Sequence, residues 1–121
     1  MCSFAENLKQ TEKATEMVKA IAYPMRLRIV AMLCRKDERV NDLVELLGTS
    51  QANVSHHLRI LRMSGLVAPV RKGREARYTV AEPHVRELIQ CLERCANPAV
   101  VREVPKENSQ ARSLVQREEE E

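Results

Sequence analysis

The feature that most constrains the fold is a three-residue connection, Gly48 to Ser50, between two short amphipathic segments. Residues 40–47 have apolar positions at helical spacing and end before Gly48, a common helix stop. Ser50 is a favourable N-cap for a following helix that extends to about Met63. Two helices joined this closely must cross at a steep angle, which predicts a helix-turn-helix.

The period of the pattern then changes from helix to strand. Residues 66–71 are rich in valine and contain Pro69, which is typical of an edge strand. Residues 72–75 form a turn in which Gly73 can take a positive φ, and residues 76–80 read as the returning strand. A basic hairpin placed directly after a helix-turn-helix predicts a wing.

Three further helices are expected outside this unit, at about residues 8–22, 25–34 and 82–97. Pro24 should end or kink the first of them because proline lacks the backbone donor. Residues 35–38 read as a polar turn after the second helix. The last helix is expected to open at Glu82-Pro83 and to stop before Pro98.

The composition agrees with a small helical domain. The 121 residues are 44% hydrophobic but only 2% aromatic, so the core must be aliphatic, which favours packed helices. The predicted fold class is mainly α with a small β-hairpin (α+β): a winged helix-turn-helix with five helices, as a homodimer. Residues 1–101 should form this domain, and residues 102–121 a disordered, charged tail. With no membrane-length apolar run and no secretory start, we expect a cytoplasmic protein.

Positive charge is concentrated in one stretch of the chain. Residues 50–78 carry six Lys and Arg against one acidic residue, whereas residues 1–49 carry eight against seven. A local excess of this kind is expected of a phosphate-binding surface.

The segment after Ser50 has the two faces that a DNA recognition helix needs. Val54, Leu58 and Leu61 form an apolar face toward the core. Small or polar residues lie opposite, where close approach to base edges requires them, and arginines farther along suit phosphates. The predicted DNA-binding residues are Ser50, Gln51, Ala52, Ser55, His56, Arg59 and Arg62 of the helix and Arg71, Lys72 and Arg74 of the wing.

One recognition helix is too small a footprint for a specific site. A twofold dimer would present two, so we expect double-stranded operator DNA with an imperfect palindrome. The first and last helices are not used by the DNA-binding unit, and their apolar stripes are the expected dimer surface. His57 is interpreted as a packed or capping histidine rather than a base reader. The competing interpretation is a protein-interaction module with a solvated basic hairpin; no catalytic set is evident, so an enzyme is not expected.

The motifs resemble those of the ArsR (ArsR/SmtB) family of bacterial repressors over roughly residues 14–98. They are P-x-R-L-x-I at Pro24 to Ile29, S-x-x-x-V-S-x-H-L-x-x-L-x-x-x-G-L-V at Ser50 to Val67, and the wing with Tyr78. The resemblance implies a homodimeric repressor that binds operator DNA until an inducer releases it.

The inducer sites typical of this family are matched only in part. Arg39 and Asn41 stand where arsenic-responsive members carry a Cys-x-Cys motif, so that site is absent. Glu82 and His84 match the first zinc-ligand pair of zinc-responsive members, but the matching later positions are Cys95 and Pro98. Pro98 has no ligating side chain, which makes a zinc site of this type less expected. The match of Cys34 to the persulfide-sensing members is loose, since it lies one turn beyond their position.

The cysteines offer another inducer site. Four cysteines in a cytoplasmic chain favour free thiols, metal ligands or redox sensors over structural disulfides. Cys91 and Cys95 are four residues apart on the last predicted helix and therefore share a face. Trivalent arsenic or antimony favours three thiolates, and Cys34, Cys2 or a thiol of a partner chain could complete the set.

Two alternatives for these cysteines stay open. Cys34 and one last-helix thiol could instead form a disulfide or polysulfide bridge in a redox- or persulfide-sensing repressor. Cysteine is also often buried, so the thiols could serve packing alone. We favour arsenic or antimony as inducer, acting through Cys34, Cys91 and Cys95, ahead of thiol oxidation, persulfidation and other thiophilic metals.

Overall fold

The structure is a computed structural model that describes residues 3–99. It divides into two units, Met1–Cys91 and Leu92–Glu121, of which the second is described only as far as residue 99. The expected tail at 102–121, the end of the expected domain and Cys2 lie outside the described residues.

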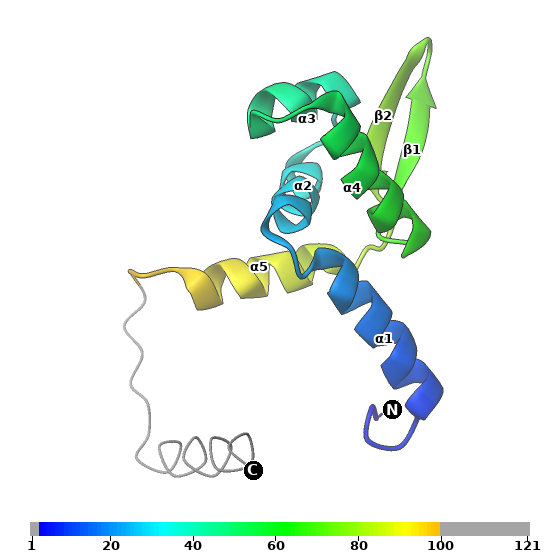
Figure 1. Cartoon of the computed structure of the whole chain (residues 1–121). Coiled ribbons are helices and arrows are strands. Elements are labelled where there is room, and N and C mark those ends of the chain that lie inside the picture. Colours follow the sequence, from blue (N-terminus) through cyan, green and yellow to red (C-terminus); the bar gives the residue numbers. More distant parts are fainter. Residues whose placement is uncertain (1–2, 100–121) are drawn as a thin grey trace. The chain divides into compact units, whose positions relative to one another are not determined.

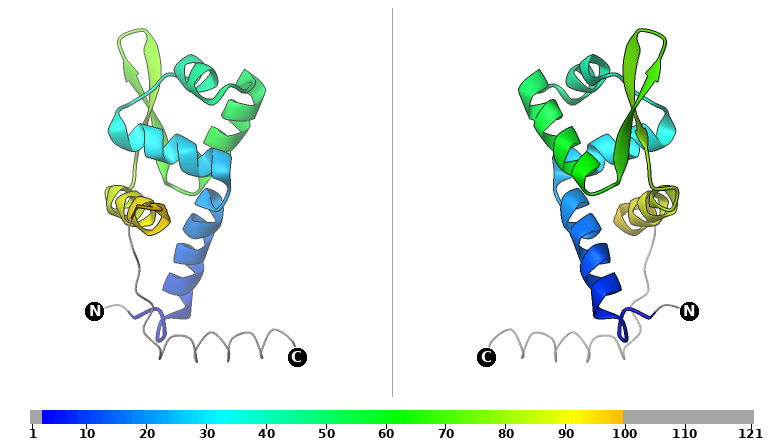
Figure 2. Two further views of the ribbon diagram at one scale, coloured as in Figure 1. Left: turned by 90° about the vertical axis from the view of Figure 1, so that its left-hand side faces the viewer. Right: turned by 90° about the vertical axis from the view of Figure 1, so that its right-hand side faces the viewer.

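The described residues form five α-helices and one antiparallel hairpin, as predicted. In chain order they are α1 (Leu8–Ile21), α2 (Pro24–Arg35), α3 (Val40–Leu47), α4 (Gln51–Met63), β1 (Val67–Lys72), β2 (Glu75–Val80) and α5 (Val85–Ala96) (Figure 1). In both views of Figure 2, α3, α4 and the hairpin lie at the same end of the first unit, and α1 extends away from them toward its N-terminus.

The first two helices correct the expected role of Pro24. α1 begins after Asn7, whose side chain accepts a 3.1 Å hydrogen bond from the backbone N–H of Gln10. It ends at Ile21, three residues before Pro24, so the proline neither ends nor kinks it. Pro24 is instead the first residue of α2, a position whose N–H has no intrahelical partner in any helix.

The helix-turn-helix forms as the glycine and the cap predict. Gly48 follows α3 with φ 66°, a left-handed conformation that glycine adopts without steric cost. α4 begins at Gln51, directly after its N-cap residue Ser50, and packs against α3.

The hairpin is longer than expected, with a tighter tip. The strands pair from Val67 with Val80 to Lys72 with Glu75, which leaves only Gly73 and Arg74 in the turn. Residues 35–38 are not simply a polar turn, because Glu38 is buried and bridges β2. Its backbone N–H donates to the Tyr78 carbonyl at 3.2 Å and its carbonyl accepts from the Tyr78 N–H at 2.8 Å. β2 is therefore paired with β1 along one edge and bridged by Glu38 at the other.

The core is aliphatic and draws on every helix. α2, α3 and α4 supply most of it, and the start of α5 closes it. The buried members are Ala20, Ile21, Ile29, Val30, Leu33, Leu43, Leu47, Val54, Leu58, Leu61, Leu66, Val67, Val85 and Ile89. Because one side of α4 packs into this core, the opposite side faces solvent.

The last helix starts later than expected. Pro83 and His84 form a turn, and α5 begins at Val85. The guanidinium Nη1 of Arg86 donates to the backbone carbonyl of Cys34, which ties the start of α5 to the end of α2. None of the helices within residues 3–99 has the length and apolarity needed to cross a membrane.

Candidate nucleic-acid interface

At the start of α4, Asn53 donates two hydrogen bonds to the side chains of the preceding turn. The Ser50 hydroxyl accepts from the backbone N–H of Asn53 at 3.1 Å, which satisfies a donor that the helix leaves unpaired. The Asn53 side-chain amide donates to the Thr49 hydroxyl at 3.0 Å. The end of α4 that would approach a duplex is thus held rigidly to the turn.

The two faces of α4 are those predicted from the sequence. Val54, Leu58 and Leu61 are buried, at 0–1% exposure. The predicted DNA-binding residues of this segment are all exposed: Ser50, Gln51, Ala52, Ser55, His56, Arg59 and Arg62. The exposed side carries positive charge but no acidic residue.

The wing stands beside this face and carries exposed basic side chains. α4 contacts β1, and the hairpin projects beyond the helix (Figure 1). Arg71, Lys72 and Arg74 are exposed around the tip, where Gly73 has φ 68°. The structure therefore brings the two predicted groups of DNA-binding residues to adjoining elements of one unit.

His57 lies on the inner flank of α4, unlike exposed His56. It is half-buried, and its Nδ1 has no hydrogen-bond partner among the described residues. Burial lowers the pKa of His57, and the charges of Arg26 and His56 lower it further. Partial burial and a lowered pKa are compatible with the packed role expected for His57.

The candidate inducer thiols differ in exposure. Cys34 is half-buried near the end of α2, and Cys91 is exposed on α5. Cys95 is also exposed, in the second unit, one turn after Cys91 along the same helix. Within residues 3–99, no three His, Cys, Asp or Glu side chains are grouped so as to hold a metal ion. A three-thiolate set is thus not formed by the described residues of one chain.

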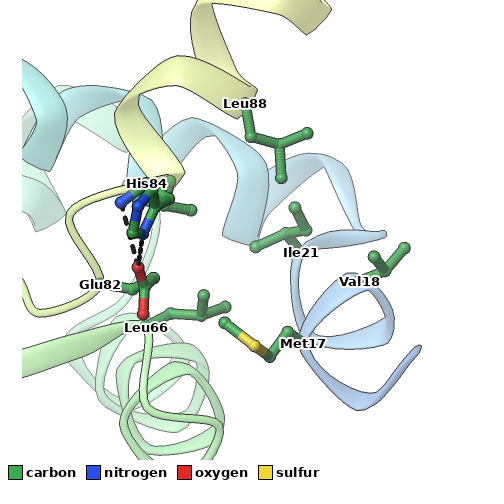
Figure 3. Close-up of a pocket in the computed structure, with 8 residues that line it drawn as sticks. Met17, Val18, Ile21, Leu66, Glu82, His84 and Leu88 are labelled. Carbon is green, nitrogen blue, oxygen red and sulfur yellow. Dashed lines mark hydrogen bonds and ion pairs between the residues drawn. The ribbon is translucent and has the colours of Figure 1, made fainter. Parts of the chain in front are cut away.

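Sequence reasoning missed an apolar pocket of about 330 Å³ in the first unit. Figure 3 shows side chains of α1, Leu66 and Leu88 around it, with the Glu82–His84 pair at one end. Its lining is Met17, Val18, Ile21, Leu66, Glu82, His84, Val85 and Leu88. Val18 and Leu88 in its lining are 55% and 40% exposed, unlike core residues. The sequence pattern shows both as apolar helix positions but does not show their exposure.

Comparison with known proteins identifies the family. The model of the family described as bacterial regulatory protein, arsR family, matches residues 24–68, which run from α2 through α4 into β1. The transcriptional activator HlyU of Vibrio cholerae is 35% identical over 86 residues, which cover 71% of this chain and 80% of HlyU. The chain belongs to the ArsR family.

Other relatives and a solved structure agree. The structure of reduced HlyU superposes with a TM-score of 0.67 at 34% identity, covering 73% of this chain and 93% of HlyU. A transcriptional repressor SmtB homolog of Synechocystis is 40% identical over 82 residues, 68% of this chain. A probable mercury resistance operon repressor of Streptomyces lividans is 38% identical over 77 residues, 64% of this chain.

These matches bear on the predictions to different extents. The winged helix-turn-helix and the resemblance to ArsR-type regulators are confirmed, and ArsR-family proteins are regulatory proteins rather than enzymes, as expected. The chain spans 62% of the length of the Synechocystis relative and 61% of the Streptomyces one.

Proposed function

We propose that this ArsR-family protein is a cytoplasmic transcriptional repressor that binds double-stranded operator DNA. The observation that carries the proposal is the exposed, basic outer side of α4 beside the basic tip of the wing. Gln51 and Ser55, in the first turns of α4, suit base edges, and Ala52 permits close approach. Arg59 and Arg62 suit phosphates, as do Arg71, Lys72 and Arg74 of the wing. His56 lies exposed beside them.

A homodimer is part of this proposal. One α4 covers too little of a duplex for specificity, whereas a twofold pair covers two half-sites about one helical turn apart. The exposed apolar positions around the pocket, including Val18 and Leu88, give a surface for the second copy. The operator should accordingly be an imperfect palindrome.

The test is binding to the DNA upstream of the protein's own gene, against random DNA, over a salt series. Specific binding should weaken steeply with salt, because phosphate contacts release counterions. Gln51→Ala should relax specificity, whereas Arg74→Ala should weaken binding to all sequences alike. Equal effects of the two variants on both DNAs would count against α4 as the reader. No binding at all would favour a protein-interaction module. If a reporter gene placed behind this DNA were activated rather than repressed by the protein, the repressor role would be contradicted.

We further propose that a thiol-binding inducer, trivalent arsenic or antimony, relieves the repression. Cys91 and Cys95 are exposed and one helical turn apart, which suits two bonds to one soft centre. Cys34, Cys2 or a thiol of the partner chain would give the third. The similarity to a mercury resistance operon repressor supports a thiophilic inducer. Zinc fits less well, because Pro98 cannot act as a ligand.

The alternative is redox or persulfide sensing by the same thiols. Operator release should be measured with arsenite, antimonite, zinc, cadmium and persulfide, in the wild type and in Cys34→Ser, Cys91→Ser and Cys95→Ser. Gln90→Ala, an exposed change on the same helix, is the matched control. Loss of the arsenite response in C91S and C95S supports the proposal; loss of only the persulfide response supports the alternative. Unaltered responses in all three would exclude thiol sensing.

A further inference from the structure

We propose that Arg39 is a positioning residue that fixes the wing against the start of α3, and with it the basic tip beside α4. It does so through an ion-pair clasp, by which we mean Arg39, Asp42, Glu75 and Arg77. The inference rests on the proposed DNA-binding function, because the wing's position matters only if the wing meets DNA.

The Arg39 guanidinium joins two elements that are far apart in the sequence. Arg39 is the N-cap residue of α3, and its Nε and Nη2 donate to the two carboxylate oxygens of Asp42 at 3.0 and 3.2 Å. Its Nη1 donates to Oε1 of Glu75, the first residue of β2, at 3.4 Å. One planar side chain thus spans the first turn of α3 and the returning strand of the wing.

Glu75 is held from both sides. Its second oxygen, Oε2, accepts a hydrogen bond from Nη2 of Arg77 at 3.1 Å. Glu75 is also the single acidic residue of the basic stretch 50–78. Two guanidinium groups therefore compensate the charge of the one carboxylate within the hairpin itself, which would otherwise repel a phosphate backbone.

The backbone beside the clasp carries the same link. Glu38, which precedes Arg39, pairs with Tyr78 of β2 through the two backbone hydrogen bonds described above. Lys72, at the end of β1, lies 3.9 Å from a carboxylate oxygen of Asp37. Residues 37–39 therefore contact the hairpin at Lys72, Glu75 and Tyr78. The turn residues Gly73 and Arg74 extend past these contacts.

Arginine is required here by its shape as well as its charge. The guanidinium presents several N–H donors in one fixed plane, so it can bind two carboxylates at once, whereas a lysine ammonium is a point charge. Hydrogen bonding with Asp42 raises the pKa of Arg39, and Arg39 lowers the pKa of Asp42. Because the Arg39 side chain is 47% exposed, the clasp should contribute little to folding and mainly orient the hairpin.

The test compares Arg39→Lys with Arg39→Gln, with Arg35→Gln as a control that removes the same charge from an exposed position at the end of α2. Two readouts are needed: operator affinity over a salt series, and amide hydrogen exchange of Glu38 and Tyr78. We expect both Arg39 variants to bind DNA about fivefold more weakly, the size expected of one exposed ion-pair network. The salt slope should not change, exchange at both amides should accelerate, and R35Q should resemble the wild type.

Three results would overturn the positioning role. Wild-type affinity in R39K, with loss and a shallower salt slope in R39Q, would make Arg39 a direct phosphate contact. Unchanged exchange in both variants would show that the clasp does not hold the wing. Faster exchange with unchanged affinity would show that its hold is irrelevant to DNA. If the wild type itself fails to bind DNA, the proposed function fails, while the exchange measurement still decides whether the clasp holds the wing.

Discussion

The imidazole Nδ1 of His84 lies 2.7 Å from Oε1 of Glu82, and the same oxygen accepts a 3.1 Å hydrogen bond from the backbone N–H of His84. The pair forms the turn that leads into α5 and lies at one end of the apolar pocket (Figure 3). The hydrogen bond that the His84 imidazole donates to Glu82, and then the charge of Glu82, raise the pKa of His84, while the hydrogen bonds that Glu82 accepts from the His84 side chain and backbone lower the pKa of Glu82.

Glu82→Gln should therefore lower the pKa of His84 toward its ordinary value of 6.5. In the wild type, the raised pKa means that the pair's stabilisation is present below pH 6.5 and is lost as the pH rises through the His84 pKa. Because the pKa of Glu82 is lowered, the stabilisation by the pair is present above pH 4.5 and is lost as the pH falls through the Glu82 pKa. NMR titration of His84 measures the shift, with His56 as the internal control. An identical His84 titration in E82Q would refute the coupling.

The two faces of α4 predict opposite outcomes at neighbouring positions. Leu58 is 1% exposed, so Leu58→Ala should lower the free energy of unfolding by about 2–5 kcal/mol. Arg59 is exposed, and Arg59→Ala should change it by less than about 0.5 kcal/mol while weakening DNA binding. Urea unfolding at one fixed protein concentration, because a dimer's stability depends on it, gives the first quantity. Comparable destabilisation by both variants would mean that the helix is oriented otherwise.

Helix α4 could be predicted from the sequence because its determinants are local. Ser50 caps α4 by accepting a hydrogen bond from the backbone N–H three residues later, and Gly48 ends α3. Each signal therefore lies next to the helix end that it determines. The apolar spacing of Val54, Leu58 and Leu61 then decides which side faces the core. The exposed residues follow from the same spacing.

The attachments of the wing could not be predicted, because they join distant segments. Glu38 reads as part of a polar turn until Tyr78, forty positions later, is placed beside it. Arg39 likewise has a local partner in Asp42 but acquires its second, Glu75, only from the fold. Among the cysteines, the spacing of Cys91 and Cys95 within α5 is local and could be predicted, whereas a proposed third thiol from another segment or a second chain would leave no local pattern.

His57 should make the protein less stable in mild acid. Burial lowers its pKa below 6.5, so the unfolded chain takes up the proton first and stability falls as the pH drops below that value. His57→Phe removes this titration, and its thermal midpoint should fall less than that of the wild type between pH 7.5 and 5.5. His56→Gln, at an exposed position, should retain most of the wild-type slope, because the charge of His56 is the smallest of the three causes that lower the pKa of His57. Parallel slopes for the wild type and H57F would contradict burial as the cause.

Ser50 should stabilise the fold through the start of α4, apart from any contact with DNA. Its hydroxyl satisfies the backbone N–H of Asn53, and Ser50→Ala leaves that donor without the partner, at a cost of about 1 kcal/mol in the free energy of unfolding. Ser50→Gly should cost only a few tenths of a kcal/mol, because glycine is itself a tolerated N-cap. Ser55→Ala, on the exposed side of α4, should be nearly neutral. Urea unfolding of the three variants without DNA separates the cap from a nucleic-acid contact, since an S50A variant as stable as S55A would leave Ser50 with no role in holding the helix.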